Sequence, residues 1–362
     1  MLSPIAKFGY IPGLDGLRAL SVLIVIAAHF GLEHIIPGGF GVTVFFFISG
    51  FLITRLLIAE SEKAKKLNLF NFYMRRLVRL YPALLFMIIG STILFALFKF
   101  GAPTKSELFA ATFYAMNILL LLQSEGTVYT YMSWNPLWSL AVEEHFYLVF
   151  PALIVFLNRD WHRLITATVF LLLMVLIWRF FIVLATDLQA EIYTSVMTDA
   201  RIDSIVWGCF LALLLHTQSS IIDRKWLVGV VPTGIAILVL LSTFLIRDPV
   251  FRQTLRYSLQ GAALLILFAN LYYNQRFSLA IWILEWKPLA WLGRLSYPLY
   301  LWHFVMFDFW QRVLENVTLV VFSAVFSSVL LASISFYLVE KPTIALRKRF
   351  GAHIVTERQP LK

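Results

Sequence analysis

Long apolar segments separated by short polar ones recur along the whole chain. The first, residues 14–32, consists mostly of Leu, Ile, Val and Ala. An apolar run of about 20 residues is the length an α-helix needs to cross a bilayer. The pattern predicts an all-α polytopic membrane protein with about ten transmembrane helices around a central cavity. The candidate spans are roughly 14–32, 38–58, 79–99, 138–158, 165–185, 203–217, 226–246, 256–273, 288–310 and 316–338.

One further apolar run, residues 107–123, is ambiguous as a span. Lys and Arg gather in loop 59–79 and in the tail after Glu340, which places both on the cytoplasmic side by the positive-inside rule. Counting 107–123 as a span would put the basic tail outside, so we expect a re-entrant or interfacial segment. Both termini are then cytoplasmic, with an integral-membrane domain at 1–343 and a basic cytoplasmic tail at 344–362.

Composition and charge narrow the class of protein. The chain is 60% hydrophobic and only 14% charged, with a mean hydropathy of +0.82, which excludes a soluble domain of this size. The net charge of +10 comes from basic residues in short segments between apolar runs. Membrane lipids, rather than nucleic acid, are therefore the expected partners. The single cysteine, Cys209, excludes an internal disulfide and a cysteine-based metal site, and we predict no metal.

The first apolar segment contains two ionisable residues, Arg18 and His29, spaced eleven apart. On an α-helix eleven steps return to within roughly 20° of the starting direction and rise about 16 Å. Arg18, His29 and nearby Asp15 therefore share one stripe of the helix. Arg18 can simply extend to lipid headgroups, and His29 can be a satisfied polar residue. Because His29 lies deep in the span, we favour a functional role for it, that of a general base.

A second motif, FYMRRLVRLYP at residues 72–82, holds three arginines at the start of an apolar span. Arg75 and Arg79 are four residues apart, and Arg76 and Arg79 three, so they form a basic face on a helix. Anchoring to anionic lipid explains such a face. Arginine also suits forked binding of phosphate groups, which favours a phosphorylated ligand.

Two further segments carry polar residues beside apolar runs. In GGFGVTVFFFISGFL, residues 38–52, the glycines indicate close helix packing, and Ser49 can hydrogen-bond into a cavity. In WNPLWSLAVEEHFY, residues 134–147, Glu143 is a candidate to orient His29. Trp138 can belong to an aromatic belt or stack on a sugar ring.

The remaining candidates lie in the second half of the chain. In DARIDS, residues 199–204, Arg201 and Asp203 suggest a local ion pair, or contact with an acceptor substrate. In LSYPLYLWH, residues 295–303, Tyr297 and His303 fall on one possible cavity-facing stripe. Two roles are open for His303: a hydrogen-bonded histidine of the core, or a catalytic histidine. Glu340 is expected to pair with Arg75 or Arg76 in a structural role.

Five motifs in this order resemble the membrane-bound acyltransferase-3 family: R-x10-H, GxxVFFFISGFL, FxxRRxxRLYP, WSLxxExxFY and LSYxLYLxH, which together cover about residues 12–343. The resemblance implies a ten-helix protein that moves an acyl group, commonly acetyl, from cytoplasmic acyl-CoA to a surface glycan. O-antigen, exopolysaccharide and peptidoglycan are among the family's targets. The resemblance also implies required roles for Arg18 with His29 and for Arg76 with Arg79. Many members carry a further extracytoplasmic hydrolase-like domain, and we expect a stand-alone transferase here.

Resemblance and helix geometry together suggest one mechanism. Arg18, Arg76 and Arg79, supported by Arg75, would hold the anionic head of acyl-CoA at the cytoplasmic mouth. His29 would take the proton from the hydroxyl of a glycan or lipid-linked sugar that enters from the outer side. The expected location is the bacterial cytoplasmic (inner) membrane. An alternative is a proton-coupled exporter or flippase of a lipid-linked glycan, which CoA binding would distinguish.

Overall fold

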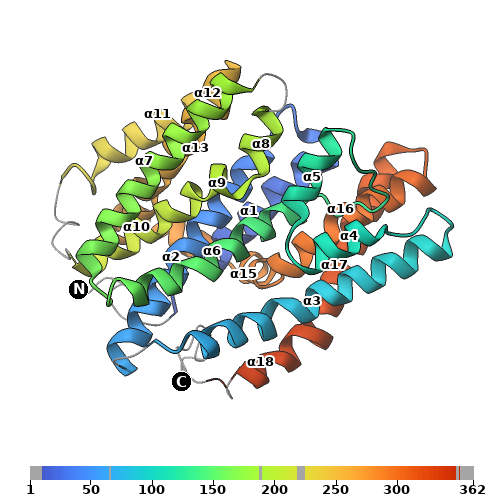
Figure 1. Ribbon diagram of the computed structural model, residues 1–362, viewed down its shortest axis with the longest axis horizontal. Coiled ribbons are helices and arrows are strands. Elements are labelled where there is room, and N and C mark those ends of the chain that lie inside the picture. Colours follow the sequence, from blue (N-terminus) through green and yellow to red (C-terminus); the bar gives the residue numbers. More distant parts are fainter. Residues whose placement is uncertain (1–9, 65–66, 187–189, 218–224, 348–349, 351–362) are drawn as a thin grey trace.

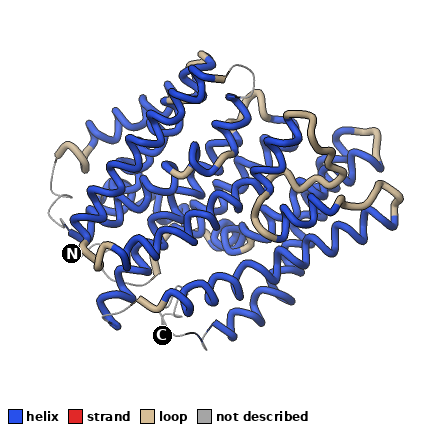
Figure 2. Tube along the Cα trace, in the orientation of Figure 1, coloured by secondary structure: helices blue, strands red, loops and turns tan. Residues whose placement is uncertain are grey.

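The computed structural model describes residues 10–64, 67–186, 190–217, 225–347 and 350. Over these residues the chain is helical and contains no strand (Figure 2). Lys65 and Lys66 of the predicted cytoplasmic loop, and most of the predicted tail at 344–362, lie outside the described residues.

The elements run along the chain in the order α1 (Leu14–Ala27), π-helix η1 (Ala28–Leu32), α2 (Gly38–Ala64), α3 (Leu69–Leu97), α4 (Lys105–Thr112), α5 (Met116–Ser124), α6 (Leu137–Phe156), α7 (Trp161–Ala185), α8 (Ala190–Val196), α9 (Thr198–Arg201), α10 (Asp203–Thr217), α11 (Val230–Leu245), α12 (Pro249–Gln253), α13 (Leu255–Tyr273), 3₁₀-helix η3 (Gln275–Phe277), α14 (Ser278–Leu284), α15 (Lys287–Arg294), α16 (Ser296–Val313), α17 (Val317–Ile334), π-helix η4 (Ser335–Glu340) and α18 (Lys341–Arg347).

Helices occupy each of the ten predicted spans, and three of these spans contain two helical elements each. Within the described part of the chain, 6 helices are long and apolar enough to cross a membrane, so the prediction of an integral membrane protein holds while the count of ten stays a prediction. The predicted span 288–310 is split at Leu295 between α15 and α16. Pro298, in the first turn of α16, has no N–H to continue the preceding helix.

The ambiguous run at 107–123 forms two short helices, α4 and α5, of 8 and 9 residues. Tyr114 lies between them with a φ of 55°. Neither helix is long enough to cross a bilayer, in agreement with the expected re-entrant or interfacial segment. Buried Glu107 caps α4 and accepts hydrogen bonds from the backbone N–H groups of Tyr131 and Met132, both at 2.7 Å, so it fastens the following loop to this segment.

The first helix packs among α2, α15 and α16 near the middle of the bundle (Figure 1). Glycines make this possible, because they let backbones meet. A Cβ added at Gly16 would lie 2.2 Å from the Leu284 carbonyl oxygen, and one at Gly293 would lie 1.8 Å from that of Asp15. No side chain separates α1 from α14 at Gly16 or from α15 at Gly293, so the position of α1 is set by backbone contact.

Helices α2 and α10 form a second close pair, in the same way. A Cβ added at Gly50 would lie 2.0 Å from the Ile205 carbonyl oxygen, and one at Gly208 would lie 2.0 Å from that of Phe47. Figure 1 shows α3 and α18 along one side of the bundle and α7, α11 and α13 along the other. Helices α1, α2, α6 and α16, which carry several of the predicted site residues, lie between these sides.

The Gly50–Ile205 contact gives a test of the packing. We expect Gly50→Ala to lower the melting temperature in detergent, since its Cβ must push α2 away from α10 at a cost of about 1–3 kcal/mol. The matched control is Gly234→Ala in α11, where a Cβ meets nothing within 4 Å. That change should be neutral or stabilising by about 1 kcal/mol, because alanine favours helices over glycine. Equal melting temperatures for the two variants would contradict the close approach.

Candidate active site

His29 lies in the π-helix that ends the first helix. The α-helical part stops at Ala27, and the widened turn continues to Leu32. Gly31 has a φ of +102° and Phe30 a ψ of 24°, so the backbone leaves the α-helical path immediately after His29. Glycine takes this φ without strain. Single π-helical turns often mark functional positions, because they re-aim one side chain out of the regular helix.

The His29 ring meets the ring of His303 from α16. His29 Nδ1 and His303 Nε2 are 2.8 Å apart, and the two rings are nearly parallel, with planes inclined by 6° and centroids 5.1 Å apart. Phe304 packs edge-on against His29 at 5.0 Å. His303 is 0% exposed, whereas His29 keeps part of its surface accessible. The structure thus brings together two histidines from different apolar spans.

Tyr300 supports His303 from one helical turn earlier. His303 Nδ1 lies 2.7 Å from the Tyr300 carbonyl oxygen, and the Tyr300 hydroxyl donates to the carbonyl of Pro136 at 2.9 Å and meets Ser139 at 2.7 Å. This connects α16 to the start of α6. The predicted stripe of Tyr297 and His303 is only partly formed. His303 meets His29, whereas the Tyr297 hydroxyl donates to the Leu80 carbonyl of α3 at 2.9 Å.

Glu143 and Ser49 belong to a polar cluster between α2, α3 and α6. Both the Ser49 and the Tyr147 hydroxyls donate to the Glu143 carboxylate. The guanidinium of Arg76 lies 3.3 Å from the centre of the Tyr147 ring and forms a salt bridge of 3.2 Å with Glu144. The hydrogen-bond partner of His29 is therefore His303 and not Glu143.

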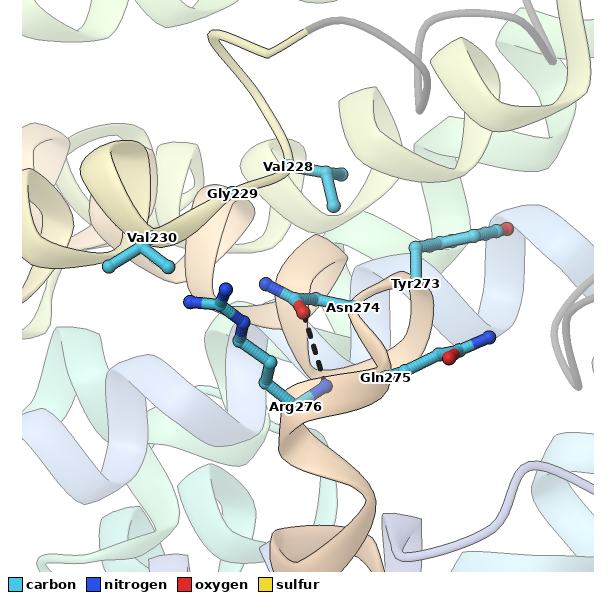
Figure 3. Close-up of a pocket in the computed structure, with 7 residues that line it drawn as sticks. All are labelled: Val228, Gly229, Val230, Tyr273, Asn274, Gln275 and Arg276. Carbon is cyan, nitrogen blue, oxygen red and sulfur yellow. Dashed lines mark hydrogen bonds between the residues drawn. The ribbon is translucent and has the colours of Figure 1, made fainter.

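A cavity of about 190 Å³ opens beside this cluster, lined by Tyr73, Arg76, Leu77, Leu80, Tyr114, Glu144, Tyr147 and Leu148. Ligand pockets usually measure about 300–1,000 Å³, so this space would have to widen to hold a large ligand. A larger cavity of about 480 Å³ lies elsewhere, against Gly229 and Arg276, and contains none of the predicted site residues (Figure 3).

Two of the predicted donor arginines, Arg18 and Arg79, interact electrostatically with buried Glu340. The expected partners of Glu340, Arg75 and Arg76, are occupied elsewhere. Arg75 is buried, forms a 2.5 Å salt bridge with Glu60 of α2 and donates to the Phe350 carbonyl at 2.9 Å. Neighbours on a helix differ in direction by about 100°, so Arg75 and Arg76 meet different helices.

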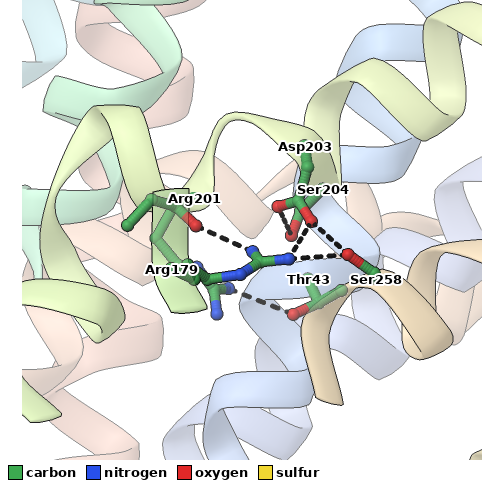
Figure 4. A network of polar contacts seen from close by, with 7 residues as sticks. Thr43, Arg179, Arg201, Asp203, Ser204 and Ser258 are labelled. Carbon is green, nitrogen blue, oxygen red and sulfur yellow. Dashed lines mark hydrogen bonds and ion pairs between the residues drawn. The ribbon is translucent and has the colours of Figure 1, made fainter. Parts of the chain in front are cut away.

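Arg201 and Asp203 do not form the expected local pair. Asp203 forms a salt bridge of 2.7 Å with Arg179 of α7, and both side chains are 0% exposed (Figure 4). Ser258 of α13 also donates to Asp203, at 3.0 Å. Sequence reasoning overlooked Arg179, although a lone arginine within an apolar span signals a buried carboxylate partner.

Arg201 is held by aromatic rings and one hydroxyl. Its guanidinium lies 3.7 Å from the centre of the Tyr257 ring and 5.8 Å from that of Trp138, and it donates to Thr43 at 3.1 Å. Trp138 therefore lies inside the bundle beside a cation. Asp15 lies apart from these groups, near Tyr272, with which it interacts electrostatically.

The segment before α10, on the predicted outer side, is tied down by Asp199. Its carboxylate accepts hydrogen bonds from Tyr193 at 2.5 Å and from Trp178 at 2.8 Å. Burial, reinforced by the neighbouring carboxylate, raises the pKa of Tyr193 to about 12. Tyr193 therefore stays protonated at neutral pH, and Asp199 of α9 connects α8 to α7 through its two hydrogen bonds.

No group of three or more His, Cys, Asp or Glu side chains that could hold a metal ion occurs among the described residues.

Comparison with known proteins places this arrangement in a family. The O-acetyltransferase OatA of Staphylococcus aureus (strain NCTC 8325 / PS 47) is 33% identical over 92% of this chain and 57% of its own length. The peptidoglycan O-acetyltransferase OatA of Listeria monocytogenes is 30% identical over 92% of this chain and 56% of its own. The chain thus spans little more than half of these relatives, and no solved structure matches it. The acyltransferase domain model of the family matches residues 11–338, nearly the whole chain, which therefore belongs to the acyltransferase-3 family.

Proposed function

We propose that this chain is a membrane O-acetyltransferase that uses acetyl-CoA from the cytoplasm to acylate a hydroxyl of an extracytoplasmic glycan. The observation that carries the proposal is the partly accessible imidazole of His29, held against His303 inside an apolar bundle. A neutral imidazole in such a place is suited to accept a proton from a hydroxyl.

In this proposal His29 acts as the general base. It takes the proton of the acceptor hydroxyl as the hydroxyl oxygen attacks the thioester carbonyl carbon. The carbon–sulfur bond then breaks, and the CoA thiolate leaves as the new ester forms. Because the surrounding aromatic side chains limit access of water, the thioester would be guarded against hydrolysis.

Arg18 and Arg79 are the residues we assign to the donor's phosphate groups. Both lie near Glu340, and guanidinium groups bind phosphate through paired N–H donors. Arg76 lines the cavity beside Glu144, so we assign it to the wall along which the donor's arm would pass. Arg75 is occupied by Glu60 and is given a structural role.

The acceptor remains a glycan or lipid-linked sugar that approaches from the outer side of the inner membrane. The name of the Listeria relative favours a peptidoglycan sugar over O-antigen or exopolysaccharide. Aromatic Trp138 and buried Arg201 lie beside Phe46 of α2, and we propose that they support the acceptor end of the site.

Replacing His29 by Ala should lower the rate of acetyl transfer by about 10²–10⁴-fold, the usual contribution of a general base. Binding of CoA to the purified variant should change little, because the imidazole contacts the reacting atoms only. The matched control is His145→Ala, which removes a histidine of α6 that bonds Thr198. Retained transfer in His29→Ala would rule out the base.

Replacing Arg79 by Ala should raise the dissociation constant for CoA by about 10–100-fold. A lost charge-assisted hydrogen bond costs about 1.5–3 kcal/mol. Arg79→Lys keeps a positive charge beside Glu340 and should fall between the wild type and Arg79→Ala. Arg163→Ala is the control, since this exposed arginine pairs only locally with Asp160 at 3.1 Å. Calorimetry that finds the same affinity in all four proteins would overturn the donor assignment.

A further inference from the structure

We infer that His303 is a positioning residue that fixes the tautomer of His29, so that His29 Nε2 carries the reactive lone pair. The inference deepens the proposed function and rests on it for its kinetic part. Its structural part depends only on the two rings and the Tyr300 carbonyl.

The first step concerns His303 alone. Its Nδ1 lies 2.7 Å from the Tyr300 carbonyl oxygen, and a carbonyl can only accept a hydrogen bond. His303 Nδ1 must therefore carry a proton. The ring is 0% exposed and contacts His29, Phe30, Tyr300 and Phe304 rather than a carboxylate, so it is buried in its neutral form. A neutral imidazole protonated at Nδ1 has an unprotonated Nε2.

The second step passes this constraint to His29. Because His303 Nε2 is an acceptor, the nitrogen 2.8 Å from it, His29 Nδ1, must be the donor. A neutral His29 protonated at Nδ1 keeps its lone pair on Nε2. No described residue hydrogen-bonds to His29 Nε2, and the His29 side chain is partly accessible, so Nε2 is free to meet a substrate hydroxyl.

The arrangement also accounts for the path of the proton in the proposed reaction. The proton of the acceptor hydroxyl moves to His29 Nε2, and the resulting imidazolium keeps Nδ1–H hydrogen-bonded to His303 Nε2. When the carbon–sulfur bond breaks, His29 Nε2–H gives its proton to the thiolate sulfur, which yields free CoA and returns His29 to its starting tautomer. His303 holds no net charge at either end of this cycle, and it takes the role that a carboxylate has beside many catalytic histidines.

The test is two-bond ¹H–¹⁵N correlation spectroscopy of donor-free protein with ring-labelled histidine, assigned with His29→Gln. We expect His29 protonated at Nδ1 and unprotonated at Nε2. In His303→Phe, which fills similar space without an acceptor, this pattern should be lost. In His303→Gln, whose amide oxygen can accept from His29 Nδ1, it should persist. A wild-type spectrum with His29 protonated at Nε2 would overturn the inference, whatever the protein's activity.

Kinetics of the same variants test the consequence. His303→Phe should lower kcat by about 10²-fold with the KM for acetyl-CoA nearly unchanged, since a wrong tautomer removes the base but not the donor site. His303→Gln should recover at least about 10-fold of the loss. The control is His145→Phe, the same substitution at a histidine of α6 that bonds Thr198 rather than His29. Equal rates for the Phe and Gln variants would contradict a role through hydrogen-bond acceptance.

The outcomes separate the two proposals. If the spectra show the expected tautomer but purified protein neither binds CoA nor transfers acetyl groups, the proposed function fails while the tautomer assignment for His29 stands. If transfer occurs and His303→Phe leaves kcat unchanged, the positioning role of His303 fails while the proposed function stands.

Discussion

The contact between His29 and His303 joins two segments that are 274 residues apart in the sequence, inside the bundle. Two imidazoles in an apolar interior are costly unless each satisfies the other, and here one 2.8 Å hydrogen bond does so with a backbone carbonyl as the final acceptor. Other contacts hold the helices that carry these two rings in place. Glycine contacts hold α1 against α15, and Tyr300 ties α16 to α6.

Charged groups elsewhere in the bundle also need a partner when they are buried. Arg179 and Asp203 neutralise one another between α7 and α10, and Arg75 and Glu60 do so between α2 and α3. Arg76 is paired with Glu144 and covered by Tyr147. Removing one partner of such a pair leaves a buried charge, so these pairs hold the bundle together as well as shaping the site. Arg18 and Arg79 differ in that they share one carboxylate, Glu340, at an end of the polar interior.

The sequence predicted what depends on local periodicity. Apolar runs located the helices, and the first run contains Arg18 in α1 and His29 in the π-helix η1 that follows it. Which side chains meet across helices could not be predicted, because pairing depends on the rotation and depth of helices far apart in sequence. Glu340 was therefore expected beside Arg75 or Arg76, and Glu143 beside His29. One usable signal was missed: histidines in different apolar spans each need a polar partner, and two of them can satisfy one another.

Gly31 has a consequence for how the arginine–histidine spacing is understood. A side chain at a φ of +102° is strained, so the widened turn after His29 depends on a residue without a Cβ two positions later. A residue with a Cβ at this position would strain the backbone that follows His29, although the added atom would meet no neighbour within 4 Å. The spacing alone is thus an incomplete description of the motif: arginine, histidine and the following glycine form one unit.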